Sequence, residues 1–378
     1  MTTEEESLST AEEESLSTAE EGYSVQRDFW RQAAESDGFD LENVKLRPGM
    51  NGVVTGLIPY DCQLYKRYPY RILVNLYAKV GLHRYNLFKG TSFELATLMK
   101  FNMLQNYMSS FYITLLAHDP DPAASSLQKT FQVRVDEQDY GTLHIRCSIA
   151  RPKAEVSTEM SFRPHFHGGA LADGIFKGEL PDWPSDDALN DGKRFYVSGK
   201  PMIGFLCGAR AYGIFKGELP DWPSDDAFND GKRFYLVKES EWQSTDWISM
   251  YLELVITTTD RSITETRQKT EVLSQLEIVK VAIETANEDV EPPNERLKAK
   301  SAHVYITFKG LAEPRAPRRV FENGEHVERQ AIVRRVMDHT GYLTLKGKLC
   351  GGEYIKKRSL ALKSGEESQD CKKQARVG

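Results

Sequence analysis

Two histidines in the segment RPHFHGG are the first residues whose spacing could support chemistry. His165 and His167 are separated by one residue, so in an extended backbone both imidazoles project to the same side, as two metal ligands would. No third ligand follows at a recognisable spacing. We therefore interpret His165 and His167 as an ordinary surface pair, with metal binding as the alternative.

Cys62, in IPYDCQ, could be imagined as a nucleophile, but no neighbouring side chain supplies a base or lowers the pKa of its thiol. We expect a structural thiol instead. The sequence also has no glycine-rich phosphate loop, Ser/His/Asp order, Cys/His/Asn signature or complete metal-ligand set. It therefore predicts no catalytic residues and no cofactor, as in a protein that is not an enzyme.

A tandem duplication carries the residues that could form a recognition loop. GIFKGELPDWPSDDALNDGKRFY (174–196) returns as GIFKGELPDWPSDDAFNDGKRFY (213–235), and the single difference is Leu189 against Phe228. Each copy places a tryptophan among carboxylates: Trp183, Asp186 and Asp187, then Trp222, Asp225 and Asp226. An exposed aromatic anchor with an acidic rim would suit partner recognition. We favour the alternative, a Pro/Asp turn whose tryptophan packs locally, and least favour a glycosidase pair of carboxylates.

Two copies are too few for a solenoid, which usually needs three to bury a continuous core. Their near-identity indicates a recent copying event, or an error of gene prediction, rather than structural selection. The second copy continues directly into LVKESEWQSTDWISMYLEL, so we take residues 174–212 as the insertion.

The candidate residues above need a folded scaffold, and its first predicted element is a helix that includes YAKVGLHRYN and the residues just before it. Apolar residues recur there at helical spacing: Ile72, Leu73, Leu76, Tyr77 and Val80. We expect Asn75, Lys79 and Arg84 to face away from this stripe. Gly90 predicts the end of the helix, whereas Gly81 in its interior costs about 1 kcal/mol relative to alanine.

The apolar period then changes from 3.6 to 2, which predicts four half-buried strands. Their alternating residues are Phe93, Leu95, Met99, Phe101 and Met103; Phe111, Ile113 and Leu115; Phe131, Val133 and Val135; Leu143, Ile145, Cys147 and Ile149. Turn-rich segments separate the strands, as in an antiparallel meander with one solvated face. We expect the helix to cover the other face.

The same order returns beyond residue 240. A helix is predicted around Trp247–Ile256, followed by strands at 276–284, 303–310, 327–336 and 342–349. HVYITF in the second half echoes SFYITL in the first. We hypothesise a second helix-plus-four-strand unit, related to the first by an old duplication. Another topology, or a mere extension of the first sheet, would contradict it.

A helix ending in Tyr-Asn, a long strand, FYITL and two more strands resemble the cystatin/monellin arrangement. More widely, DFWRQAAESDGFD, IPYDCQ, LYAKVGLHRYN, CSIARP, TDWISMYLEL and EHVERQAIVRR resemble an uncharacterised plant protein family, uncharacterised protein family 0725, of the cystatin/monellin superfamily. The resemblance covers roughly residues 28–355. It implies an α+β fold with a helix packed on an antiparallel sheet, in two such units, and no established activity.

The superfamily also suggests inhibition of cysteine proteases. Plant cystatins carry a Gln-x-Val-x-Gly hairpin before the YYITL strand, and its place here falls on Leu104, Gln105, Asn106, Tyr107 and Met108. None of the three defining residues is present, and Met108 replaces the glycine that permits close backbone approach. The second hairpin, near 136–142, lacks Pro-Trp. We therefore expect a non-catalytic protein-interaction module with an unknown protein partner, and keep a cystatin-type inhibitor as the alternative.

Charge and composition bound the partners. The first 22 residues repeat EEESLSTA and hold eight glutamates without lysine or arginine, so the formal charge of −6 becomes +2 without them. A near-neutral remainder indicates no global field for nucleic acid or membrane. We interpret the basic clusters 314–319 and 356–358 as solvated loops and tails rather than nucleic-acid contacts.

No secretory signal or bilayer-length apolar stretch occurs, and five widely spaced cysteines agree with free thiols in a reducing compartment. We expect an intracellular protein of the cytoplasm or nucleus. The predicted order is a disordered acidic tail (1–22), a lead-in with a short helix at 28–36 followed by an irregular segment (23–69), unit 1 (70–152), a linker with the duplicated block (153–240), unit 2 (241–352) and a basic flexible tail (353–378).

Overall fold

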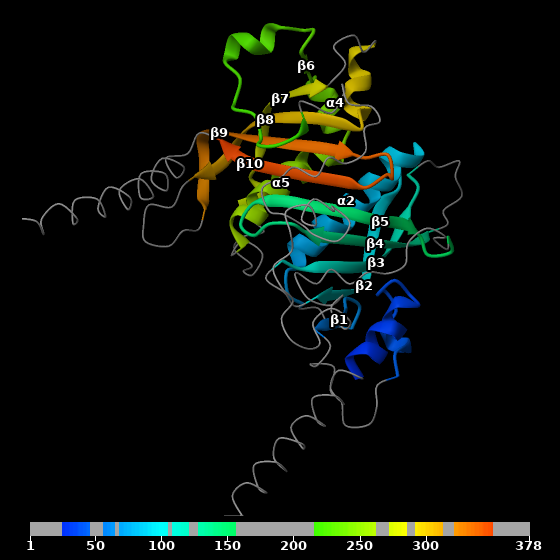
Figure 1. The fold of residues 1–378 in the computed structure, drawn as a ribbon. Helices are drawn as coiled ribbons and strands as arrows, with labels where there is room; N and C mark the ends of the chain where they lie inside the picture. The colour runs from blue at the N-terminus through cyan, green and yellow to red at the C-terminus, as the bar shows by residue number, and fades with distance from the viewer. Residues whose placement is uncertain are drawn as a thin grey trace, which may run out of the picture.

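The computed structural model describes residues 25–45, 56–64, 68–104, 108–120, 128–155, 215–261, 272–285, 292–312 and 321–350. Within these ranges the chain forms a mixed α/β structure around one ten-stranded antiparallel sheet, in the order β1-β2-β3-β4-β5-β10-β9-β8-β7-β6 (Figure 1). The strands are β1 (Leu57–Asp61), β2 (Glu94–Leu104), β3 (Ser110–His118), β4 (Lys129–Glu137), β5 (Leu143–Pro152), β6 (Phe234–Leu236), β7 (Glu277–Thr285), β8 (Ser301–Ala312), β9 (Glu322–Met337) and β10 (Leu343–Cys350).

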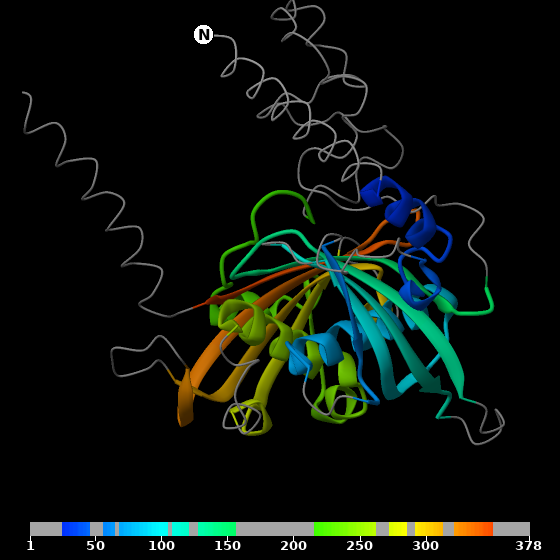
Figure 2. The ribbon, with the colours of Figure 1, turned by 90° about the horizontal axis from the view of Figure 1, so that it is seen from below.

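Two helices, α2 (Arg71–Lys89) and α5 (Asp246–Thr259), lie side by side on one face of the sheet, which curves around them (Figure 2). Their buried residues and the inward residues of both halves of the sheet form one continuous core. Residues 25–34 form a further helix, and short helical segments include η1 (Leu41–Asn43), η4 (Asp225–Asn229), α4 (Glu239–Gln243) and η6 (Pro293–Lys298). No helix in the described ranges is long and apolar enough to cross a bilayer.

The predicted helix is confirmed as α2, with Leu76 and Val80 buried and Gly90 ending it in the left-handed conformation. The expectation that Arg84 faces away is wrong. Arg84 is buried and donates to the carbonyl oxygens of Gly341 (2.7 Å) and Ala150 (3.2 Å). The helix packs on β2 to β5, and Arg84 reaches both β5 and the turn before β10, so even this polar position meets the sheet.

The four strands predicted in the first half are confirmed, but two of them change phase within the strand. Register shifts in β2 turn Leu98 into the core and leave Met99 partly exposed. A shift where β4 meets β5 sends Ile149 to the outer face, opposite Arg134, while Cys147 stays in the core. A bulge inserts one residue and so reverses the alternation beyond it.

The lead-in is more regular than predicted. Residues 25–34 are helical, as expected near 28–36, but residues 57–61 form the edge strand β1 instead of an irregular segment. Pro59 lies within β1 opposite Asn102. An edge strand tolerates proline because one of its sides needs no hydrogen-bond donor.

The second half repeats the order of the first, with α5 followed by β7 to β10 at the predicted places. These strands do not build a sheet of their own, so the hypothesis of a separate second unit is wrong in this respect. They extend the first sheet through the antiparallel pair β5 and β10, in which Leu345 lies opposite Ile145. This pairing removes one exposed edge from each set of strands.

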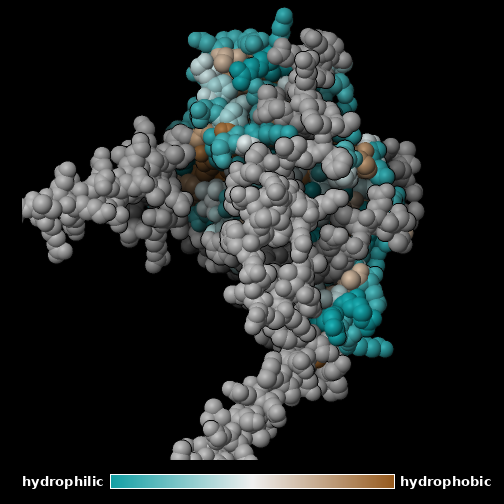
Figure 3. Space-filling view, viewed as in Figure 1, coloured by the Kyte–Doolittle hydropathy of each residue, from teal (hydrophilic) through white to brown (hydrophobic). Residues whose placement is uncertain are grey.

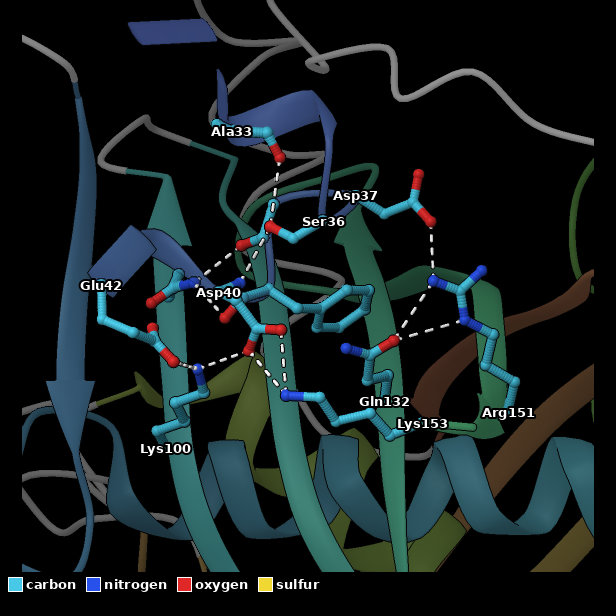
Figure 4. A network of polar contacts seen from close by, with 12 residues as sticks. Ala33, Ser36, Asp37, Asp40, Glu42, Lys100, Gln132, Arg151 and Lys153 are labelled. Atoms are coloured by element: carbon cyan, nitrogen blue, oxygen red, sulfur yellow. Dashed lines mark hydrogen bonds and ion pairs between the residues drawn. The ribbon is translucent and has the colours of Figure 1, made fainter. Parts of the chain in front are cut away.

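The N-terminal segment lies on the outer face of the first half, with α2 on the other side of the strands (Figure 4). Phe39 packs edge-on against Tyr112 at 5.8 Å between ring centroids. Ion pairs surround this contact: Asp37 with Arg151 at 2.6 Å, and Asp40 with Lys100 at 2.7 Å and Lys153 at 2.9 Å. The outer face therefore holds a chain segment through an aromatic contact and a ring of charges.

Candidate functional site

The outer face of the second half gathers polar side chains from three neighbouring strands. Register places Glu284 of β7 opposite His303 of β8, and His303 opposite Arg334 of β9. Tyr305, two residues after His303, therefore points to the same side. All four side chains are buried although they lie on the face opposite α5.

Glu284 is the centre of this cluster. Its carboxylate accepts from Arg233 Nε (2.6 Å), Tyr305 OH (2.7 Å) and His303 Nδ1 (3.1 Å). Arg334 Nε donates to His303 Nε2 at 2.9 Å, so the ring carries its hydrogen on Nδ1 and donates it to Glu284. The polar groups are thereby linked in a defined order from Arg334 to Glu284.

The environment shifts the pKa values of both Glu284 and Tyr305. Burial alone would raise the pKa of Glu284, but the hydrogen bonds from His303, Tyr305 and Arg233 prevail and lower it to about 2. Burial and the adjacent carboxylate raise the pKa of the Tyr305 hydroxyl above its ordinary value. The cluster is thus held as a carboxylate and a neutral phenol, a state that suits a structural anchor better than proton transfer near pH 7.

We expect Glu284 to make stability fall with acid. Its depressed pKa means that its contribution is complete above pH about 4.5 and is lost as the pH falls towards about 2. Because Arg233 is half exposed and screened by solvent, we expect the substitution Glu284→Gln to lower the free energy of unfolding by about 1–2 kcal/mol at pH 7. Urea denaturation from pH 7 to pH 2.5 measures it.

The difference between E284Q and the wild type should shrink steadily below pH 4.5. The substitution E277Q, at an exposed position of the same strand, is the matched control and should follow the wild-type profile. A constant difference between E284Q and the wild type at every pH would contradict the assignment of this titration to Glu284.

The segment from Phe215 to Leu236 is docked on this cluster. Arg334 donates through Nη1 to the carbonyl oxygen of Gly217 (2.9 Å) and through Nη2 to that of Glu218, and Lys348 Nζ donates to that of Leu219 (3.3 Å). Further along, Arg296 donates to the carbonyl oxygens of Lys232 and Arg233. We call this surface the dock; its side chains are Glu284, Arg296, His303, Tyr305, Arg334 and Lys348.

Aromatic packing completes the dock. Phe228 packs against Phe234 at 5.1 Å and Tyr305 at 5.8 Å between centroids, and the Phe215 ring lies 4.8 Å from the His303 ring. Leu219 and Ile332 are buried in the same cluster. The segment is therefore held by charged groups that contact its backbone and by apolar side chains that seal it.

The predicted recognition residues of the second copy separate into two kinds. Trp222 is partly buried and contacts Phe228 and Tyr305, each at 5.7 Å between ring centroids. The contact with Phe228 is the local packing that we favoured, whereas Tyr305 belongs to β8. Asp225 and Asp226 are exposed at the start of η4. The first-copy residues, Trp183, Asp186 and Asp187, and the histidine pair His165 and His167 lie outside the described residues.

The dock residues Glu284, His303 and Arg334 were not predicted from the sequence. A signal was present, since in HVYITF the residues His303 and Tyr305 occupy alternate positions that face away from the core side of the strand. Local alternation identifies such a face but not its neighbours, because the register between strands brings Glu284 and Arg334 to it.

Other groups that could support chemistry are placed as structural residues. Burial raises the pKa of the Cys62 thiol to about 11, that of Cys147 to about 12 and that of Cys350 to about 11. Thiols with raised pKa values are poor nucleophiles near pH 7. In the described part of the chain no three His, Cys, Asp or Glu side chains are grouped as a metal site would require.

Sequence comparison identifies the family. The chain is 77% identical to UPF0725 protein At1g23970 of Arabidopsis thaliana over 386 residues, which cover 100% of both chains. The chain belongs to the UPF0725 family. It is 52% identical to UPF0725 protein At1g23960 over 332 residues (87% of this chain, 95% of the relative) and 40% identical to UPF0725 protein EMB2204 over 327 residues (85% and 79%), both from Arabidopsis thaliana. The predicted resemblance to an uncharacterised plant family is confirmed.

Residues 219–345 of this UPF0725 chain also match the protein family described as Protein MS5. The match includes the docked segment from Leu219 onwards and strands β6 to β9. Among solved structures, the crystal structure of MS5 from Brassica napus is 26% identical and aligns with 75% of this chain and 100% of its own, with a TM-score of 0.46.

Proposed function

We propose that this UPF0725 protein is a non-catalytic protein-interaction module that acts inside the cell. The observation that carries the proposal is the use of the outer face, which holds two separate chain segments by the same means, aromatic contacts inside a ring of charges. At the dock, the pKa of Glu284 is lowered to about 2 and that of Tyr305 is raised above its ordinary value, so neither group exchanges its proton near neutral pH. The cysteines Cys62, Cys147 and Cys350 are free thiols, which suits a reducing compartment.

We further propose that the fold derives from two cystatin/monellin-like units whose strands have joined edge to edge into one sheet. Each half has a helix followed by four strands that are consecutive in the chain, and both helices cover the same face. The tyrosines of FYITL and VYITF, Tyr112 and Tyr305, stand at the same place in their strands. Both lie on the outer face beneath a docked segment. This correspondence supports an old duplication of one unit.

The partner surface that we propose is the acidic rim of the dock, formed by Asp221, Asp225 and Asp226. All three are exposed, whereas Trp222 is turned into the packing beneath them. Where the view in Figure 3 shows described residues, hydrophobic ones form small separate spots and most of the surface is hydrophilic. We therefore infer a partner that presents a basic segment, recognised by charge.

Affinity capture from plant extract tests this rim. We expect D225K/D226K to lose at least one protein that the wild type captures, with unchanged folding by circular dichroism, because surface substitutions usually change stability by less than about 0.5 kcal/mol. The matched control, E322K/E325K, makes the same charge change at exposed positions of β9 and should retain that protein. If all three forms capture the same proteins, the rim is not the partner surface.

A further inference from the structure

The docked segment has a second copy in the same chain, and the dock contacts features that both copies share. The residues that reach the dock from 215–236 have counterparts 39 positions earlier: Phe215 and Phe176, Gly217 and Gly178, Leu219 and Leu180, Trp222 and Trp183, Arg233 and Arg194, Phe234 and Phe195. We propose that residues 174–196 are a second, weaker occupant of the dock, exchanging with residues 213–235 of the same chain. This inference does not depend on the proposed function, because it needs no external partner.

The charged side chains of the dock bind the backbone of the docked segment, so these contacts can form with either copy. Arg334 and Lys348 donate to carbonyl oxygens of Gly217, Glu218 and Leu219, and Arg296 to those of Lys232 and Arg233. Identical sequence in the first copy can present the same oxygens at the same spacing. In the second copy, Glu284 accepts a hydrogen bond from Arg233. The first copy has the same guanidinium at the corresponding position, Arg194.

The single difference between the copies sets the order of preference. Phe228 contacts the rings of Trp222, Phe234 and Tyr305, and Lys280 Nζ lies 4.5 Å from its ring centroid. Leu189 keeps an apolar side chain at this position but loses the aromatic pairing. An aromatic pair contributes a modest stabilising free energy beyond that of burying the two side chains. We therefore expect the dock to bind the second copy roughly tenfold more strongly than the first.

The chain is long enough for the exchange to occur within one molecule. Strand order places β7 four strands from β5, which is a distance of about 20 Å across the sheet. Residues 156–173 connect the end of the described β5 region to the first copy, and such a length spans up to roughly 60 Å when extended. On the other side, residues 197–237 lead back to α4.

Carbodiimide coupling of Lys346 to the docked copy tests the exchange on the wild-type chain. Lys346 Nζ lies 3.7 Å from Glu218 Oε2, so the reagent can join them, and Glu179 is the counterpart in the first copy. Trypsin then releases peptides 217–232 and 178–193, which differ only by phenylalanine against leucine and are separated by mass. We expect both coupled products, with the leucine form on the order of one tenth of the total.

Two outcomes of this measurement would overturn the proposal. Coupling of the phenylalanine form alone would show that the first copy does not reach the dock. Leucine-form products that join two molecules, seen when isotopically light and heavy protein are mixed, would show that the first copy acts between chains and not within one.

Matched substitutions in the two copies give an independent test. Phe234 is fully buried in the dock, and Phe195 is its counterpart. We expect F195A alone to leave the melting temperature unchanged, and the addition of F195A to F234A to lower it by a further several degrees, because the replacement occupant is then lost too. If F195A leaves the melting temperature unchanged both in the wild type and in F234A, the first copy does not replace residues 213–235 in the dock and the proposal fails.

Discussion

The substitution Gly81→Ala should lower the free energy of unfolding by about 2 kcal/mol, although alanine is the better helix former. A Cβ atom at position 81 would lie 2.3 Å from both Cγ atoms of Val133 on β4, far inside contact distance. Helix propensity alone would stabilise the variant by about 1 kcal/mol. Overpacking between α2 and the sheet must outweigh that gain, since such strain costs about 1–3 kcal/mol or more. Urea denaturation followed by circular dichroism measures the sign directly.

Two further variants separate packing from propensity. The substitution V133A removes the atoms that collide, so in the double variant G81A/V133A the combined loss should be smaller than the sum of the single losses. At Gly231 an added Cβ meets nothing within 4 Å, so G231A should change stability by less than about 0.5 kcal/mol. A more stable G81A would show that α2 can move away from β4 at little cost.

Gly81 shows what a local pattern can and cannot predict. The spacing of Leu73, Leu76 and Val80 was sufficient for the helix and its buried stripe, because both follow from the period of the chain alone. The same pattern makes Gly81 a defect, whereas the structure uses it for the close approach of α2 to Val133. Arg84 was misplaced for a related reason, since its carbonyl partners come from β5 and from the turn before β10.

The strands were predictable as far as their alternation is uninterrupted. Phe111, Ile113 and Leu115 are all buried as expected, as are Phe131, Val133 and Val135. Met99 and Ile149 were misplaced because the register shifts of β2 and of the β4–β5 pair have no sequence signal. Phe101 and Met103, which lie beyond both shifts of β2, are buried as expected. The joining of β5 to β10 could not be inferred either, because it depends on two edges far apart in the chain.

The sequence indicated the docked segment but not the strand residues that hold it. The composition of the PDWPSDD turn singled it out in the sequence. The packing of Trp222 against Phe228 agrees with the local interpretation of that turn, whereas its contact with Tyr305 of β8 was not predicted. Glu284, His303 and Arg334 come from three different strands, and none of them belongs to a recognisable motif within its own segment. Charged anchors of this kind become recognisable only when strand register is known.

Acid should destabilise the interface between the two helices through His83. This side chain of α2 is stacked on Trp247 of α5 at 5.6 Å between centroids, and its Nε2 lies 2.9 Å from Tyr251 OH. Burial, reinforced by the nearby Arg335 guanidinium, lowers the pKa of His83 from 6.5 to about 3. The folded state therefore binds this proton less readily than the unfolded state. Its stability is complete above pH 6.5 and falls as the pH drops towards 3.

The expected loss is about 2–3 kcal/mol between pH 7 and pH 4, since each unit of pKa difference is worth about 1.4 kcal/mol. Arg335 cannot relieve it by moving away, because it is fully buried, lies 4.7 Å above the Trp247 ring and donates to the carbonyl oxygen of Leu297 at 3.0 Å. Chemical denaturation at a series of pH values measures the loss.

The substitution His83→Gln isolates this titration from the others. Glutamine can still hydrogen-bond to Tyr251 but carries no charge at any pH, so the stability of H83Q should vary less between pH 6.5 and pH 4 than that of the wild type. Glu284 loses its contribution only below about pH 4.5, and it does so equally in both proteins. Parallel profiles for the two proteins would mean that His83 is hydrated when charged, and that the contact between α2 and α5 opens without cost.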